Sequence, residues 1–212
     1  MQKWDTFLIL GGAALLLLGG AGWMAARRRS GPPTRPLSIV AVGDSLTAAG
    51  GYCKELQRVL PAGSSVRCLG APGEGVAKFL PLAGEGRLVG ADYVIVLGGV
   101  NDLASGRSLE HITQHLSKIY STAHQYGAEV IAVTLTPWGG HYKGKKLNWE
   151  TQELNKWIIY QAPVEYVVDS QGLGDETGYL QSQYGAGDGL HLSPAGQTAL
   201  GQMIYNQVWM GA

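Results

Sequence analysis

Hydrophobic residues in this chain gather in short runs, each closed by a polar or glycine-bearing segment. Five such runs lie near Ser38–Val42, Val66–Leu69, Tyr93–Leu97, Val130–Leu135 and Tyr166–Val168. Short apolar runs bounded by turn residues are typical of strands that are buried on both faces. We therefore predict five buried strands.

Between these runs, apolar residues recur at helical spacing. We predict helices near Gly51–Val59, Leu109–Tyr126, Trp149–Gln161 and Pro194–Trp209. The second carries one apolar stripe, formed by Leu109, Ile112, Leu116, Ile119 and Ala123. Wholly apolar strands that alternate with helices predict a parallel sheet covered on both faces. The fold class is therefore α/β, a three-layer α/β/α sandwich.

A longer apolar stretch, residues 7–26, precedes the first strand and carries no charge. At about 1.5 Å per residue it is long enough to cross a hydrocarbon core of about 30 Å, so we predict one N-terminal transmembrane helix. A cleaved secretory signal, the alternative, would be shorter and would end in an A-x-A-like site. We expect residues 1–29 to form this anchor with its basic flank, 30–36 a proline-rich linker and 37–212 one domain.

The charges that flank the apolar stretch bear on its orientation. Three arginines, Arg27 to Arg29, and Arg35 follow it, whereas Lys3 precedes it and is offset by Asp5. By the positive-inside rule the domain would then face the cytoplasm.

Charge and cysteine content exclude some function classes. The chain has 16 Lys+Arg and 16 Asp+Glu among 212 residues, so neither a basic nucleic-acid surface nor an acidic tail is indicated. Cys53 and Cys68 lie in no metal-ligand spacing, and we predict no metal site. We interpret them as two small buried hydrophobic residues, with a disulfide as the alternative.

Four polar blocks stand out against this pattern. The first three, Gly43–Leu46, Gly70–Gly75 and Gly98–Asp102, each follow a predicted strand, and the fourth, Asp188–Pro194, precedes the last helix. The carboxyl ends of parallel strands meet at one edge of the sheet, so we expect the blocks to lie together. The first block alone is also what a helix cap looks like.

In this order the blocks resemble those of the SGNH, or GDSL-type, hydrolases: a Ser in a G-D-S-L block, a Gly, an Asn in a G-x-N-D block, and a D-x-x-H block. The resemblance covers Leu37 to the C-terminus. It implies a flavodoxin-like sheet and a serine esterase that works through an acyl-enzyme without a metal or organic cofactor. Bacterial relatives often act outside the cytoplasmic membrane, which leaves the side of the membrane open.

The resemblance assigns a role to each block. Ser45 is the nucleophile, His191 its general base, and Asp188 orients the imidazole. The oxyanion donors are the backbone N–H groups of Ser45 and Gly73 and the side-chain amide of Asn101.

One block departs from the family pattern. The family often has an Asn a few residues before the catalytic glycine, where this chain has Cys68 or Leu69. Gly70 and Gly75 are therefore alternative donors to Gly73.

Two aromatic residues are candidates for binding the substrate. Trp138 lies in a lysine-containing loop after the fourth strand, and Tyr184 in the segment that leads to Asp188. A solvated loop with an incidental aromatic residue is an equal alternative for Trp138. We expect an ester or acyl substrate, either a lipid or an O-acylated glycan. The alternatives are an acyltransferase with the same residues and a non-catalytic membrane-tethered binding module.

Overall fold

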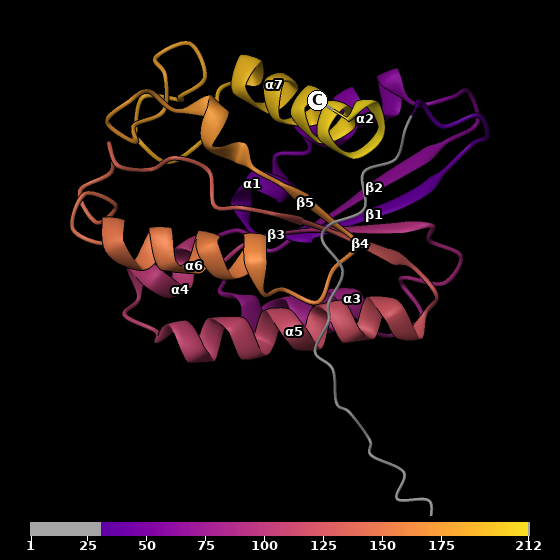
Figure 1. The fold of residues 1–212 in the computed structure, drawn as a ribbon, viewed down its shortest axis with the longest axis horizontal. Coiled ribbons are helices and arrows are strands. Elements are labelled where there is room, and N and C mark those ends of the chain that lie inside the picture. The colour runs from indigo at the N-terminus through magenta and orange to yellow at the C-terminus, as the bar shows by residue number, and fades with distance from the viewer. Residues whose placement is uncertain (1–30, 212) are drawn as a thin grey trace, which may run out of the picture.

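The computed structural model describes residues 31–211 and contains one sheet of five strands (Figure 1). The strands are β1 (Ser38–Gly43), β2 (Ser65–Gly70), β3 (Tyr93–Leu97), β4 (Glu129–Val133) and β5 (Tyr166–Val168). Their order is β2-β1-β3-β4-β5, and all neighbours are parallel. This is the flavodoxin-like order, with its switch point beside β1.

The four predicted helices are confirmed as α2 (Gly51–Val59), α5 (Leu109–Gln125), α6 (Asn148–Tyr160) and α7 (Pro194–Tyr205), the last followed by a π-helical turn, η3 (Asn206–Met210). Shorter turns were not predicted. They are α1 (Ser45–Ala48), α3 (Leu80–Ala83), α4 (Val100–Ala104) and the 3-10 turns η1 (Val76–Phe79) and η2 (Ser170–Leu173). Segments of four or five residues are too short to show a helical period, which explains why the pattern missed them.

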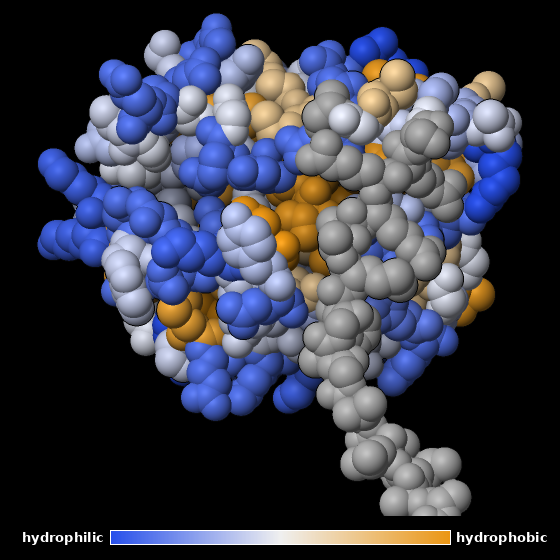
Figure 2. All heavy atoms as spheres, in the orientation of Figure 1, coloured by the Kyte–Doolittle hydropathy of each residue, from blue (hydrophilic) through white to orange (hydrophobic). Residues whose placement is uncertain are grey.

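Helices cover both faces of the sheet, α2 and α7 on one and α3, α5 and α6 on the other (Figure 1). Successive residues of β1 alternate between the two layers: Ile39 belongs to one buried cluster and Val40 to the other. The stripe on α5 is buried from Ile112 to Ala123, as predicted. The helices' outer surfaces are mostly hydrophilic, and apolar residues show near the centre of this view, over β5 (Figure 2).

The fourth strand ends two residues earlier than predicted. The amide of Thr134 still donates to the backbone carbonyl of Val168 in β5 at 3.0 Å. The amide of Leu135 instead donates to the side-chain oxygen of Asn155 in α6 at 2.9 Å. A helix side chain therefore replaces the strand partner at this edge.

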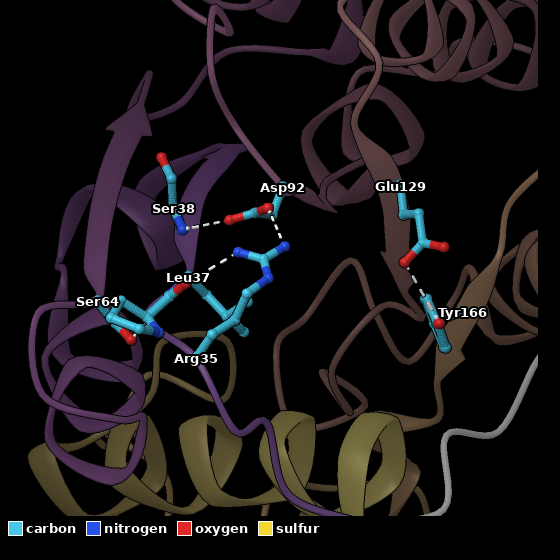
Figure 3. Close-up of polar contacts among 8 residues, drawn as sticks. Arg35, Leu37, Ser38, Ser64, Asp92, Glu129 and Tyr166 are labelled. Atoms are coloured by element: carbon cyan, nitrogen blue, oxygen red, sulfur yellow. Dashed lines mark hydrogen bonds and ion pairs between the residues drawn. The ribbon is translucent and has the colours of Figure 1, made fainter.

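The chain enters the domain at the amino edge of the sheet. The Gly31 amide donates to the backbone carbonyl of Trp209 at 3.0 Å. The Trp209 ring packs edge-on against Tyr93, the first residue of β3. Nearby, the Asp92 carboxylate accepts from the Ser38 amide at 2.8 Å and pairs with Arg35 (Figure 3).

Within residues 31–211, no helix has the length and apolar character needed to cross a bilayer. The predicted anchor, residues 7–26, lies outside the described residues.

Cys53 and Cys68 form a disulfide, which corrects their interpretation as two separate buried residues. Cys53 lies on α2 and Cys68 on β2, with their Cα atoms 6.3 Å apart. Because α2 packs over β2, the two side chains meet in the fold, although their 15-residue separation gives no sign of it. In the chain-entropy account, a loop of this length contributes about 3 kcal/mol to the free energy of unfolding.

Candidate active site

Three side chains form a hydrogen-bonded row at the carboxyl edge of the sheet. Ser45 is the first residue of α1, directly beyond β1, and its Oγ lies 2.9 Å from His191 Nε2. The other ring nitrogen, Nδ1, lies 2.6 Å from Oδ2 of Asp188. An ionised carboxylate only accepts hydrogen bonds, so we assign the proton to Nδ1, which leaves Nε2 to accept from the serine hydroxyl.

The Asp188 carboxylate is oriented by its own loop. Its Oδ1 accepts from the amides of His191 at 2.8 Å and Leu190 at 3.0 Å. Burial opposes ionisation, but the hydrogen bonds from the His191 ring and these two amides outweigh it and hold the pKa of Asp188 well below its usual range. Asp188 is therefore ionised at neutral pH.

Gly189 fits this loop against its neighbour. Its φ of +76° is one that other residues rarely adopt, and a Cβ there would overlap the backbone of Gly140 and His141. The turn that carries Asp188 and His191 thus packs directly on the loop after β4.

Buried polar contacts hold the turn that carries Ser45. Gln197 of α7 donates to the Leu46 carbonyl at 3.0 Å and accepts from the Tyr52 amide at 2.9 Å. The Thr47 hydroxyl lies 2.9 Å from the Tyr52 hydroxyl, and Gln197 is 4% exposed. Sequence reasoning did not find Gln197, because a glutamine on a C-terminal helix carries no local sign of a contact with residues 46 and 52.

The predicted oxyanion donors follow β1, β2 and β3, which are adjacent strands of the sheet. Among residues 31–211, no hydrogen bond engages the backbone N–H of Ser45 or of Gly73. Gly73 is exposed, with a φ of +75° and open space where a Cβ would stand. The Asn101 amide donates one hydrogen to the Glu74 carbonyl at 3.0 Å, which fixes its orientation and leaves its second hydrogen for another acceptor.

The two alternative glycines are placed for packing. Gly70 ends β2, and a Cβ there would overlap Ala48; a Cβ on Gly75 would overlap the carboxylate of Asp102. Packing therefore explains the glycines at positions 70 and 75, and the choice of Gly73 as the donor stays a prediction.

Residues 41–199 match the model of the GDSL-like lipase/acylhydrolase family. The chain belongs to this family. It is therefore a GDSL-type ester hydrolase, as the four blocks implied.

Solved structures of the same fold include a family 3 carbohydrate esterase from Clostridium thermocellum, 21% identical, with a TM-score of 0.61 over 82% of this chain and 95% of that one. A lipase/acylhydrolase from Enterococcus faecalis is 21% identical, with a TM-score of 0.60 over 81% and 95%. A GDSL-like lipase from Bacteroides thetaiotaomicron is 15% identical, with a TM-score of 0.65 over 84% and 91%. No curated protein matches this chain.

The carboxyl after Asn101 supports the glycine loop of this GDSL-type hydrolase. Asp102 is 3% exposed, and it accepts from the Val76 amide at 2.8 Å. Burial raises the pKa of Asp102, and the hydrogen bond from Val76 opposes that rise. The contact ties the residues after β3 to the loop after β2.

The Asp of the G-D-S-L block is buried behind the nucleophile. Asp44 is 1% exposed and caps α1 by accepting from the Leu46 amide at 3.0 Å. Burial raises its pKa to about 6, and the charge of Asp102 acts in the same direction. The amide of Leu46 and the charge of His191 oppose the rise.

We expect Asp44→Asn to change how stability depends on pH. A carboxyl with an unfolded pKa of about 4 and a folded pKa of about 6 binds more protons when folded, so its contribution to stability falls as pH rises through that window. Urea unfolding at pH 4 and pH 8 should show the variant gaining on the parent by on the order of 2 kcal/mol at the higher pH. An equal difference at both pH values would contradict the raised pKa of Asp44.

The two predicted substrate-binding aromatics have different surroundings. Trp138 is 2% exposed and donates its indole N–H to Thr151 at 3.0 Å, and it also lies in the lining of a cavity of about 310 Å³. The Tyr184 side chain is half-buried and packs against the buried cluster that contains Leu200 and Ile204 of α7, and its backbone carbonyl accepts from the Ser193 amide at 2.8 Å. The role of each aromatic residue toward a substrate stays a prediction.

Proposed function

We propose that this protein is a serine esterase that hydrolyses carboxylic esters through an acyl-enzyme on Ser45. The observation that carries the proposal is the hydrogen-bonded row Ser45–His191–Asp188, because acyl transfer needs a nucleophile, a base and a carboxylate that orients the base. The oxyanion donors that it also needs are proposed to come from the ends of adjacent strands.

Each step of the proposed reaction uses one of these groups. Ser45 Oγ attacks the ester carbonyl carbon while His191 Nε2 takes the hydroxyl proton, and the oxyanion accepts from the amides of Ser45 and Gly73 and from Asn101. The tetrahedral intermediate expels the alcohol, which takes the proton from Nε2. Water then attacks the acyl carbon, giving its proton to Nε2, and the acid leaves as Ser45 regains that proton. Asp188 stabilises the imidazolium in both halves.

We further propose that residues 7–26 anchor the enzyme in a membrane and that its domain lies outside the cytoplasm. The disulfide between Cys53 and Cys68 supports the outer side, because such bonds persist in oxidising compartments. Thiol alkylation of intact cells, with and without prior reduction, tests this proposal. The two cysteines should react with the alkylating reagent only after the disulfide has been reduced. Alkylation without reduction would contradict the outer placement.

The position of the site favours a substrate beyond the bilayer surface. Gly31 enters at the amino edge of the sheet, whereas Ser45 lies at the carboxyl edge, so an anchor before Gly31 would direct the site away from the membrane. An ester on an O-acylated glycan fits that geometry better than a bilayer lipid. The carbohydrate esterase among the proteins of similar fold is consistent with this choice.

A p-nitrophenyl ester series from acetyl to palmitoyl, with the full chain in detergent, tests the activity. We expect hydrolysis that a serine-directed fluorophosphonate abolishes by labelling Ser45, with short acyl groups preferred. Labelling without hydrolysis in water, but with ester formation on an added alcohol, would indicate the acyltransferase. A folded protein that neither labels nor hydrolyses would overturn the proposal.

The proposed oxyanion donor Asn101 gives a further prediction. Asn101→Ala should lower kcat by roughly 100-fold with little change in KM, because a donor aimed at the oxyanion acts mainly in the transition state. Steady-state kinetics on the preferred ester measure both constants. A rise in KM at unchanged kcat would show that Asn101 serves only to bind the substrate.

A further inference from the structure

A cavity of about 280 Å³ opens beside the proposed oxyanion donors. Gly73 and Asn101 form part of its lining, and so do the η1 turn and the start of α5. A substrate whose ester carbonyl points at these donors would have one of its two sides in this cavity. We propose that the cavity binds an anionic group of the substrate, a carboxylate or phosphate carried close to the scissile ester. This inference rests on the proposed function.

Basic side chains from three segments line the cavity. They are Lys78 of η1, Arg107 in the turn between α4 and α5, and His111 in the first turn of α5. Within the described part of the chain, neither Lys78 nor Arg107 forms an ion pair. A guanidinium presents planar donors that match the oxygens of a carboxylate or phosphate, which makes Arg107 the main candidate contact.

The acidic residues of the cavity do not cancel this charge. Asp102 is buried and already accepts from the Val76 amide, which leaves Glu74 as the one exposed carboxylate in the lining. A third cation lies nearby: Lys143 donates to the Ala104 carbonyl at 3.0 Å, next to a serine that lines the cavity. Lys78, Arg107 and Lys143 therefore outnumber the one exposed carboxylate of the lining.

A second cavity gives the apolar part of a substrate a place of its own. It has a volume of about 500 Å³ and lies between α2 and the start of α7, with Ala49, Leu192 and Pro194 in its lining. Its Arg58 is paired with Glu55 at 2.6 Å, so that guanidinium is already engaged. Lys54 also lines the second cavity and forms no ion pair within the described part of the chain, but neither Gly73 nor Asn101 lies there. The cavity at Gly73 is therefore the one of these two that combines such cations with the two proposed donors, Gly73 and Asn101.

The test compares two esters of one shape, 4-acetoxybenzoate, which is anionic, and its methyl ester, which is neutral. The quantity measured is the ratio of their kcat/KM values, in which differences in the amount of active enzyme cancel. Arg107→Gln should lower the anionic-to-neutral ratio about threefold, and Lys78→Gln combined with Arg107→Gln about tenfold, as expected for exposed charges. Glu74→Gln should raise the ratio about threefold.

Lys118→Gln is the matched control, because Lys118 is an exposed lysine of α5 outside the cavity. It should leave the ratio unchanged. A ratio that stays constant in the double variant, while Ser45-dependent hydrolysis of both esters continues, would overturn the anion site alone. Absence of Ser45-dependent hydrolysis of either ester in the parent would overturn the proposed function and this inference with it.

Two further substrates identify the source of the anion. O-acetylated polygalacturonate carries carboxylates, with acetylated xylan as its neutral counterpart, and lysophosphatidylglycerol carries a phosphate, with monoacylglycerol as its counterpart. The double variant should lose activity selectively on one anionic member. Equal loss on the charged and neutral members of both pairs would overturn the inference.

Discussion

Ser45→Ala should reduce ester hydrolysis by about 10⁶-fold in kcat, the size of loss seen when a triad nucleophile is removed. The variant keeps the oxyanion donors and His191 but has no atom that can form the acyl-enzyme. The loss should not come from unfolding, because Ser45 Oγ hydrogen-bonds to His191 and not to the residues that hold the turn. The contacts of Gln197 that hold this turn use backbone atoms of Leu46 and Tyr52.

The measurement is a single-turnover burst with p-nitrophenyl acetate, together with thermal unfolding of both proteins. Ser182→Ala is the matched control, since Ser182 is exposed and lies on the segment that leads to Asp188. It should retain the parent's burst and rate. Activity of Ser45→Ala within tenfold of the parent would refute Ser45 as the nucleophile.

The proximity of the first three polar blocks could be predicted from the sequence alone. Ser45, Gly73 and Asn101 each follow one of three adjacent strands, and parallel strands end at one edge, so their approach follows from the order of elements. His191 needed only Asp188 at three residues' distance for its second partner. These are the residues whose positions depend on topology and local spacing.

The residues that support the site depend on tertiary packing and were not predicted. Gln197 reaches residues 46 and 52 from the last helix, and the disulfide joins a helix to a strand that packs beneath it. Trp138 was predicted as a residue of the loop after the fourth strand, and its hydrogen bond to Thr151 of α6 could not be predicted either. The direction of a side chain beyond the end of a strand depends on the helix that packs against it, and the hydrophobic periodicity of the sequence carries no information about that contact.

Asp188→Asn should lower kcat by about 10⁴-fold, the loss that follows when the orienting carboxylate of a triad becomes an amide. Oδ2 of Asp188 lies 2.6 Å from His191 Nδ1 and accepts its N–H, which keeps the ring proton on that nitrogen. An amide oriented by the same backbone contacts can turn its N–H₂ toward the ring, which would favour the tautomer protonated on Nε2. That tautomer cannot accept the Ser45 proton. The substitution also removes the negative charge that stabilises the imidazolium formed in both halves of the reaction.

Comparison with Asp175→Asn isolates this effect. Asp175 is also a turn carboxylate and accepts from the amides of Thr177 and Tyr179. Within residues 31–211, no hydrogen bond or ion pair joins it to the Ser45–His191–Asp188 row. We expect its variant to keep kcat within a few-fold of the parent. The rate of fluorophosphonate labelling at Ser45 provides a second readout, which should fall with kcat in Asp188→Asn because both reactions need His191 to accept the serine proton. If Asp188→Asn retained kcat within tenfold of the parent, Asp188 would be a loop-capping residue, and another acceptor would have to orient His191.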